Sequence, residues 1–167
     1  METQETWEGI AGREPYDFIV AHYLTGYIKD LELFLERVAG ALALGGMFSV
    51  NVSGASREHG FWQELFARLQ LRTDFLKERE TKSLKEWEAL RELLSGYFSR
   101  VENVTLGSLM RYTDGTEVFA YLLERYPEAK KYLVENEAVL KEYFVSEIKK
   151  KGAFLLPKST DFQHCYK

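Results

Sequence analysis

The sequence has little of what marks a disulfide-bonded, membrane-spanning or nucleic-acid-binding protein. One cysteine, Cys165, stands among its 167 residues, which excludes an internal disulfide and favours a reducing compartment. No apolar run approaches the roughly 20 residues of a membrane-spanning helix, and the acidic start 1–5 does not resemble a signal peptide. The formal net charge of -4 argues against a general nucleic-acid-binding surface. We therefore expect a cytoplasmic protein whose partner is a small molecule, not nucleic acid or membrane.

The sequence does contain ample material for a hydrophobic core. Hydrophobic residues make up 46% of the chain and aromatic residues 14%, which argues against disorder. A chain of this length fits one domain, and no internal repeat or low-complexity linker divides it. We expect a single domain over residues 1–167.

The stretch 16–53 predicts a strand, a helix and a second strand. Residues 17–21 form an apolar, β-branched run, and such continuous apolarity suits a strand covered on both faces. Asp30 offers an N-cap for a helix. The apolar residues that recur at helical spacing after it are Leu31, Phe34, Leu35, Val38, Ala41 and Leu42. We expect Gly45-Gly46 to end this helix and 47–52 to form a parallel strand, which indicates α/β architecture.

This stretch resembles the fourth-strand to fifth-strand segment of class I S-adenosylmethionine-dependent methyltransferases. The likeness lies in the aromatic–Asp pair Tyr16-Asp17 that opens the first strand and in the Leu-Gly-Gly turn 44–46 before the second. Leu44 stands where the family usually has proline. The loop after the first strand reads His22-Tyr23, where the family often has Asn-His.

Later segments are similar to the remaining strands of that family. Ser83 opens a capping-box sequence, which predicts a helix beginning there. Residues 101–108 resemble the sixth strand and 152–166 the return of the seventh. The resemblance implies a partial Rossmann-like sheet flanked by helices, with strand order 4-5-7-6 and the last strand antiparallel. Residues 1–15 would be a lead-in, and 110–152 a helical, lid-like insertion.

The family's first three strands and its glycine-rich cofactor loop have no counterpart in this sequence. Only residues 1–15 precede the first predicted strand. The segment Gly9-Ile10-Ala11-Gly12 does not replace the loop, because no apolar strand leads into it and no helix follows. We expect a C-terminal portion of a methyltransferase fold, with little cofactor affinity and no activity on its own.

This layout would leave an open, uncharged strand edge at Phe18–Ala21, which is a liability for solubility. We therefore expect the edge to be covered. A separately encoded N-terminal half, a second copy in a homodimer, and residues 3–12 folding back are the three candidates.

Ligands of α/β sheets lie beyond the carboxyl ends of parallel strands. The resemblance implies S-adenosyl-L-methionine as the cofactor in the complete enzyme. The residues expected to face the cofactor are Ala21, His22 and Tyr23, and those expected to face a small-molecule methyl acceptor are Tyr27, Asn51 and Ser53. Since the cofactor carries the reactive methyl group, the protein mainly positions the reactants, and no catalytic residue or metal ligand is assigned.

Each candidate also has a purely structural interpretation. His22 could hydrogen-bond locally, and Tyr23 and Tyr27 could pack in a core. His59 lies in a polar helix start and is expected to be solvated. Neighbours on a strand point to opposite faces, so His164 and Cys165 cannot form a joint metal site.

Three functions fit these observations. The first is a small-molecule methyltransferase present as a C-terminal fragment. The second is a non-catalytic interaction module derived from the same fold. The third is another doubly wound protein, such as a response-regulator-like domain, which the C-terminal hairpin-like return disfavours. The acceptor atom is not assigned.

Overall fold

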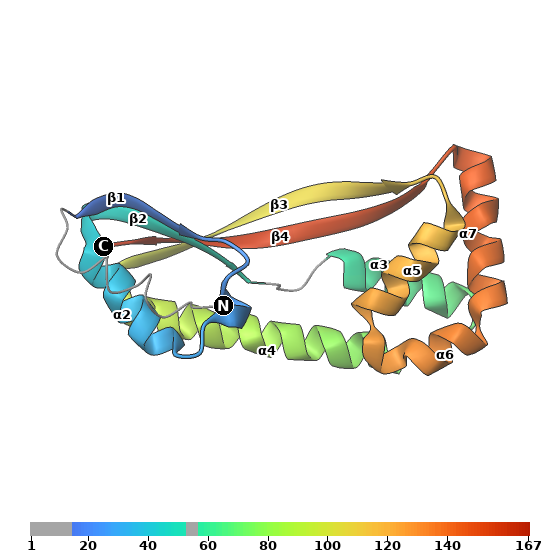
Figure 1. The fold of residues 1–167 in the computed structure, drawn as a ribbon, viewed down its shortest axis with the longest axis horizontal. Helices are drawn as coiled ribbons and strands as arrows, with labels where there is room; N and C mark the ends of the chain where they lie inside the picture. The colour runs from blue at the N-terminus through green and yellow to red at the C-terminus, as the bar shows by residue number, and fades with distance from the viewer. Residues whose placement is uncertain (1–14, 53–56) are drawn as a thin grey trace. The chain divides into compact units, whose positions relative to one another are not determined.

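The structure is a computed structural model that describes residues 15–52 and 57–167. Its elements, labelled in Figure 1, are β1 (Tyr16–Ala21), η1 (Thr25–Tyr27), α2 (Leu31–Ala41), β2 (Leu42–Val52), α3 (Arg57–Arg68), α4 (Asp74–Tyr97), β3 (Arg100–Tyr112), α5 (Gly115–Arg125), η2 (Pro127–Ala129), α6 (Lys130–Glu135), α7 (Glu137–Lys151) and β4 (Phe154–Tyr166). Within these residues, no helix combines the length and the apolarity needed to traverse a bilayer. The segment 3–12 and the residue Ser53 lie outside the described residues.

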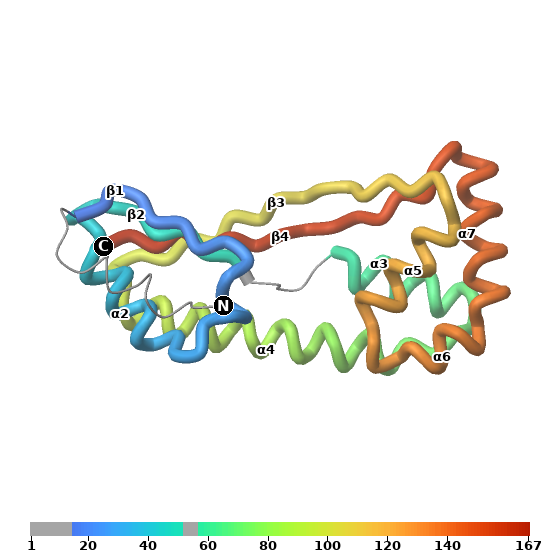
Figure 2. Tube along the Cα trace, in the orientation of Figure 1, coloured from blue at the N-terminus to red at the C-terminus, as the bar shows by residue number. Residues whose placement is uncertain are grey.

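The described strands form a mixed sheet in the order β1-β2-β4-β3. β1 runs parallel to β2, with Ile19 opposite Phe48, and Figure 2 shows the two strands side by side. β4 runs antiparallel to β2, with Phe48 opposite Cys165. This confirms the predicted α/β fold class, the 4-5-7-6 strand order and the antiparallel last strand.

The chain divides into two compact units. Unit 1 comprises the described residues 15–52 together with Thr81–Leu106 and Thr160–Lys167. Unit 2 comprises the described residues 57–80 together with Gly107–Ser159. Each unit has its own buried cluster of apolar side chains.

The core of unit 1 lies between one face of the sheet and its helices. The Asp30 side chain accepts a hydrogen bond of 2.9 Å from the Leu33 backbone N–H, which confirms the predicted N-cap of α2. The side chains that form this core are Ala21, Phe34, Leu35, Val38, Leu42, Phe48, Val50, Leu90, Leu94, Phe98 and Cys165. The apolar stripe of α2 thus packs against the β1–β2 pair, and Figure 1 shows the helix lying along these two strands.

The two faces of β1 differ in burial. Ile19 and Ala21 point to the face that carries the core of unit 1. Phe18 and Val20 point to the opposite face and are 52% and 47% exposed. The described residues therefore cover β1 on one face, whereas the continuous apolar run had suggested cover on both.

The prediction that Gly45-Gly46 ends the first helix is wrong. α2 ends at Ala41, and Leu42 is already extended and buried, because its side chain belongs to the core of unit 1. The two glycines lie inside β2, where the pairing with β1 shifts register and Gly45 has φ +78°. Gly45 has the left-handed conformation that a residue without Cβ adopts readily, and Gly46 stands where a Cβ would touch backbone oxygens.

The core of unit 2 is rich in aromatic rings. Trp62 stacks on Phe154 with 6.0 Å between centroids, and Phe144 meets Phe154 edge-on at 5.1 Å. α5 begins after the N-cap Asp114, whose side chain accepts a hydrogen bond from the Thr116 N–H.

The prediction that a helix begins at Ser83 is wrong. Ser83 is buried inside α4, which starts at Asp74 and contains no proline and no glycine before Gly96. Phe75 and Leu76 are buried in the core of unit 2, so the first turns of the helix are anchored upstream of the capping-box sequence. A Ser-x-x-Glu pattern also occurs inside helices, and nothing in 74–83 interrupts this one.

We predict that Gly46→Ala destabilises the protein by about 1–3 kcal/mol, as overpacking does. A Cβ at this position would lie 3.0 Å from the backbone oxygens of Ala43 and Tyr16, and backbone atoms cannot move aside as a flexible side chain can. The matched control is Gly40→Ala on the exposed side of α2, where a Cβ meets nothing within 4 Å. The control should gain about 0.5–1 kcal/mol of helix stability. Urea unfolding followed by circular dichroism measures both, and a Gly46→Ala variant as stable as the parent would contradict the close approach.

Candidate ligand-binding rim

The carboxyl end of β1 is tied to β2 by the side chain of His22. Its Nε2 lies 2.8 Å from Ser49 Oγ, and its ring meets Phe162 edge-on at 4.7 Å between centroids. Ser49 is only 2% exposed, so the hydroxyl that takes part in this hydrogen bond is buried. Burial lowers the pKa of His22, and nearby His164 lowers it further, so the imidazole is neutral at pH 7.

The next residue is tied to β2 through its backbone. The Tyr23 N–H donates a hydrogen bond of 2.6 Å to Asn51 Oδ1, and Asn51 is 3% exposed. Tyr23 has φ 59°, a left-handed conformation that is uncommon for a residue with a side chain. The residue is 68% exposed. The backbone therefore turns sharply at the strand end and leaves an aromatic side chain open to solvent.

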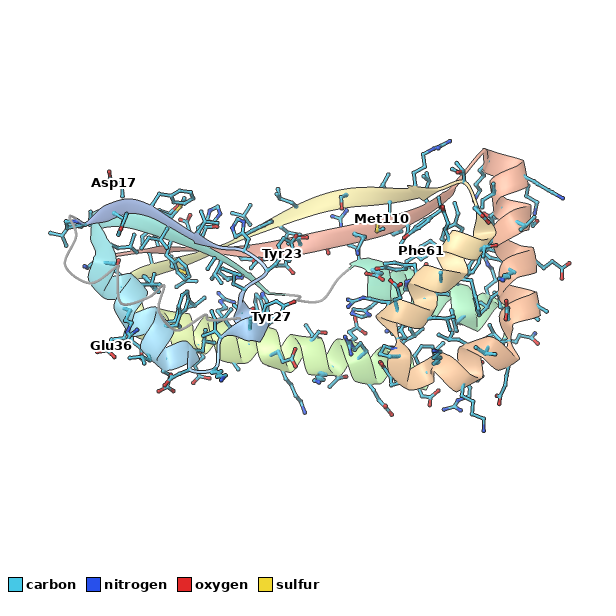
Figure 3. The ribbon with its side chains drawn as sticks, in the orientation of Figure 1. Asp17, Tyr23, Tyr27, Glu36, Phe61 and Met110 are labelled. Atoms are coloured by element: carbon cyan, nitrogen blue, oxygen red, sulfur yellow. The ribbon has the colours of Figure 1, made fainter. Side chains whose placement is uncertain are left out.

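The other residues predicted to face the cofactor or the acceptor differ in their surroundings. Ala21 is 2% exposed and belongs to the core of unit 1. Tyr27 is 84% exposed in η1, and Figure 3 labels it together with Tyr23. Ser53 lies outside the described residues. The structure thus brings His22, Tyr23 and Asn51 together, and their role in ligand binding stays a prediction.

The described part of the chain holds no group of three His, Cys, Asp or Glu side chains that could bind a metal ion. The rim instead offers the imidazole of His22 and the phenol ring of Tyr23, while the Ser49 hydroxyl and the Asn51 amide are buried and bonded to these two residues. Such groups position a ligand by hydrogen bonding and ring contact.

Unit 2 contains a buried carboxylate, Glu58, that the sequence pattern did not single out. Glu58 is 0% exposed and accepts hydrogen bonds from the Tyr121 hydroxyl at 2.7 Å and from Trp62 Nε1 at 3.3 Å. Two cations flank it, with Arg125 Nε at 3.5 Å and Lys158 Nζ at 3.8 Å. Burial, followed by the hydrogen bond to Glu58, raises the pKa of Tyr121, so this phenol stays protonated as a donor.

The prediction that His59 is solvated is wrong. His59 is 0% exposed, and its Nδ1 lies 3.2 Å from the hydroxyl of the fully buried Tyr126. Its Nε2 has no hydrogen-bond partner among the described residues. Burial lowers the pKa of His59 and is the largest cause, followed by the charge of Arg125.

A spacing signal for this cluster was present in the sequence. Glu58 lies four residues before Trp62, and Trp62 lies four before Phe66, so all three share one helix face. Because Trp62 and Phe66 are core residues, Glu58 had to be buried with them. Its cations come from distant segments and could not be identified from local spacing.

No family model matches the chain, and no curated protein matches it. Phosphoethanolamine N-methyltransferase 2 of Haemonchus contortus, in complex with phosphomonomethylethanolamine and S-adenosylhomocysteine, is 19% identical with a TM-score of 0.37, over 92% of this chain and 34% of that one. The same enzyme in complex with S-adenosyl-L-methionine is 16% identical with a TM-score of 0.37, over the same shares. The StiE O-MT structure, residues 942–1257, is 12% identical with a TM-score of 0.36, over 93% of this chain and 45% of that one.

The chain spans less than half the length of each of these solved structures. Scores this low indicate a loose likeness, so the fold is assigned from the strand order and not from these neighbours.

We predict that stability falls as the pH drops below about 6.5, the pKa of an unperturbed histidine. The folded-state pKa of His59 is lowered. At pH values between this lowered pKa and about 6.5, the unfolded chain therefore binds more protons than the folded chain. The loss therefore begins near pH 6.5, continues down to the folded-state pKa and then levels off. A single group contributes a slope of at most about 1.4 kcal/mol per pH unit.

Urea unfolding from pH 7.5 to 5 on the parent and on His59→Gln measures this contribution. The variant should lose part of the slope, and the part that remains includes the contribution of His22, whose pKa burial also lowers. An unchanged slope in His59→Gln would show that the buried imidazole does not titrate as described.

Proposed function

We propose that this chain is the C-terminal portion of a small-molecule methyltransferase that uses S-adenosyl-L-methionine. The observation that carries the proposal is the sheet order β1-β2-β4-β3, with β1 and β2 parallel and β4 antiparallel between β2 and β3. The aromatic–Asp pair at the start of β1 and the two glycines early in β2 support it from the sequence.

The rim at the carboxyl end of β1 suits one side of such a cofactor. The exposed Tyr23 ring offers an aromatic face to a cation, and a sulfonium is a cation. Neutral His22 adds no positive charge that would repel it. When bound, the cofactor supplies the methyl group, and the residues of this chain orient it and exclude water. Tyr27 and Ser53 are proposed to face the acceptor.

The same rim is incomplete as a cofactor site. The four residues that meet there, His22, Tyr23, Ser49 and Asn51, include no carboxylate to accept hydrogen bonds from ribose hydroxyls. Among the described residues, β2 is the one strand that pairs with β1. We propose that a further segment with a glycine-rich loop completes the site beside β1, supplied by an N-terminal half of the enzyme. A second copy in a homodimer is the alternative cover for this edge.

A non-catalytic interaction module is the second candidate. The exposed Phe18 and Val20 on β1 favour it, because an edge strand with apolar, uncharged side chains is suited to pairing with another chain.

Calorimetric titration with S-adenosyl-L-methionine distinguishes the methyltransferase portion from the interaction module. We expect little or no heat with this chain alone. Binding is expected once a polypeptide with an apolar strand and an acidic-x-Gly-x-Gly loop, encoded next to this chain, is added. In that complex, Tyr23→Ala should weaken binding about tenfold, the loss expected for one cation–aromatic contact.

The control is Val139→Ala on α7, where the side chain is 46% exposed, and it should leave the affinity unchanged. A complex that forms without binding cofactor would support the interaction module instead. Tight binding by the isolated chain would refute an incomplete site.

A further inference from the structure

β2 contains two buried polar side chains, Ser49 and Asn51, within an otherwise apolar segment. Buried polar groups in folded proteins are nearly always hydrogen-bonded, and each one calls for a reason. Both side chains point to the face opposite Phe48 and Val50, because successive residues of a strand alternate. They therefore do not serve the core of unit 1.

Their hydrogen bonds go to consecutive residues just beyond β1. Ser49 bonds the ring of His22, and Asn51 accepts from the backbone of Tyr23. In the strand pairing Ser49 is opposite Val20, and the last pair of the ladder is Ala21 with Val50. The Ser49 side chain bonds His22, which lies beyond that last pair. The two bonds continue the connection between the strands after their ladder ends.

The backbone at Tyr23 needs such support. A left-handed conformation is unfavourable for a residue with a Cβ, and it persists only where the surroundings determine it. The Asn51 bond is short at 2.6 Å and is made by a side chain that solvent barely reaches. Water therefore competes little for this bond. The bond fixes the N–H of Tyr23, the residue that has the left-handed conformation.

We propose that Ser49 and Asn51 are positioning residues, which we name the β2 clamp, and that they hold His22 and Tyr23 in the geometry that receives the ligand. This differs from the sequence prediction that Asn51 contacts the substrate, since its oxygen is already used by Tyr23. The β2 clamp acts on the ligand through the two rim residues. Its functional part rests on the proposed function, because that proposal makes this edge the ligand site.

Hydrogen exchange of the Tyr23 amide, followed by NMR on the chain without ligand, tests the β2 clamp directly. Asn51→Ala should speed exchange at Tyr23 about tenfold, as expected for one lost hydrogen bond, while the Phe48 and Val50 amides keep their protection. Asn51→Asp should restore slow exchange, because a carboxylate accepts the same bond. Asn51→Asp also keeps the test readable if the alanine variant folds poorly.

The matched control is Gln163→Ala, which removes another polar side chain of the same sheet. Gln163 is 1% exposed, stands opposite Val50 in the pairing of β4 with β2, and donates its hydrogen bond to Asn103 instead of to a residue of the β1 end. Exchange at Tyr23 should not change in this variant. An unchanged rate in Asn51→Ala, or an equal increase in Gln163→Ala, would overturn the β2 clamp.

The functional part is read separately in the complex that binds S-adenosyl-L-methionine. Asn51→Ala should weaken that binding about tenfold, Asn51→Asp should restore it, and Gln163→Ala should leave it unchanged. If exchange responds but affinity does not, the bond is structural only and the positioning role is refuted. If no complex binds the cofactor while exchange responds as expected, the proposed function fails and the hydrogen bond stands.

Discussion

The parallel pairing of β1 with β2 is the constraint on which the rest of unit 1 depends. It requires the chain to cross from one strand to the next through α2, which then buries Phe34, Leu35 and Val38 against the sheet. It also requires backbone to approach backbone where β2 begins, since a Cβ on Gly46 would touch the Tyr16 carbonyl oxygen. The carboxyl ends of the two strands consequently meet at one edge, where the candidate rim lies.

The parts of the fold that could be predicted from the sequence are those with local signals. Asp30 caps α2 because its carboxylate accepts a hydrogen bond from an N–H that lacks a partner within the helix, and the strand order followed from a resemblance spread over several segments. The helix ends were harder to locate. Leu42 and Phe75 are buried in the cores, and their burial decided where α2 ends and α4 begins. The glycine and capping-box signals act over only a few residues and had less effect.

The sequence predicts where the candidate site lies but not the hydrogen bonds within it, and its role in ligand binding stays a prediction. A strand ending at Ala21 places His22 and Tyr23 at an edge. Which side chains hold them depends on the register between β1 and β2, and a shift at Gly45 sets that register. The burial of Glu58 and His59 was missed for a related reason. Their partners Arg125, Tyr126 and Lys158 lie on distant segments, so polar character alone suggested solvent.

The place of β4 in the sheet has a consequence for biosynthesis. β2 pairs with β4 on one side, yet β3 and the helices α3 to α7 are translated between these two strands. A chain emerging from the ribosome therefore carries β2 with one edge unsatisfied for most of its translation. Nascent chains with such edges associate with one another and with chaperones, and pairings between distant segments form slowly. The yield of folded protein should accordingly depend on chaperone supply more than the stability of the finished fold would suggest.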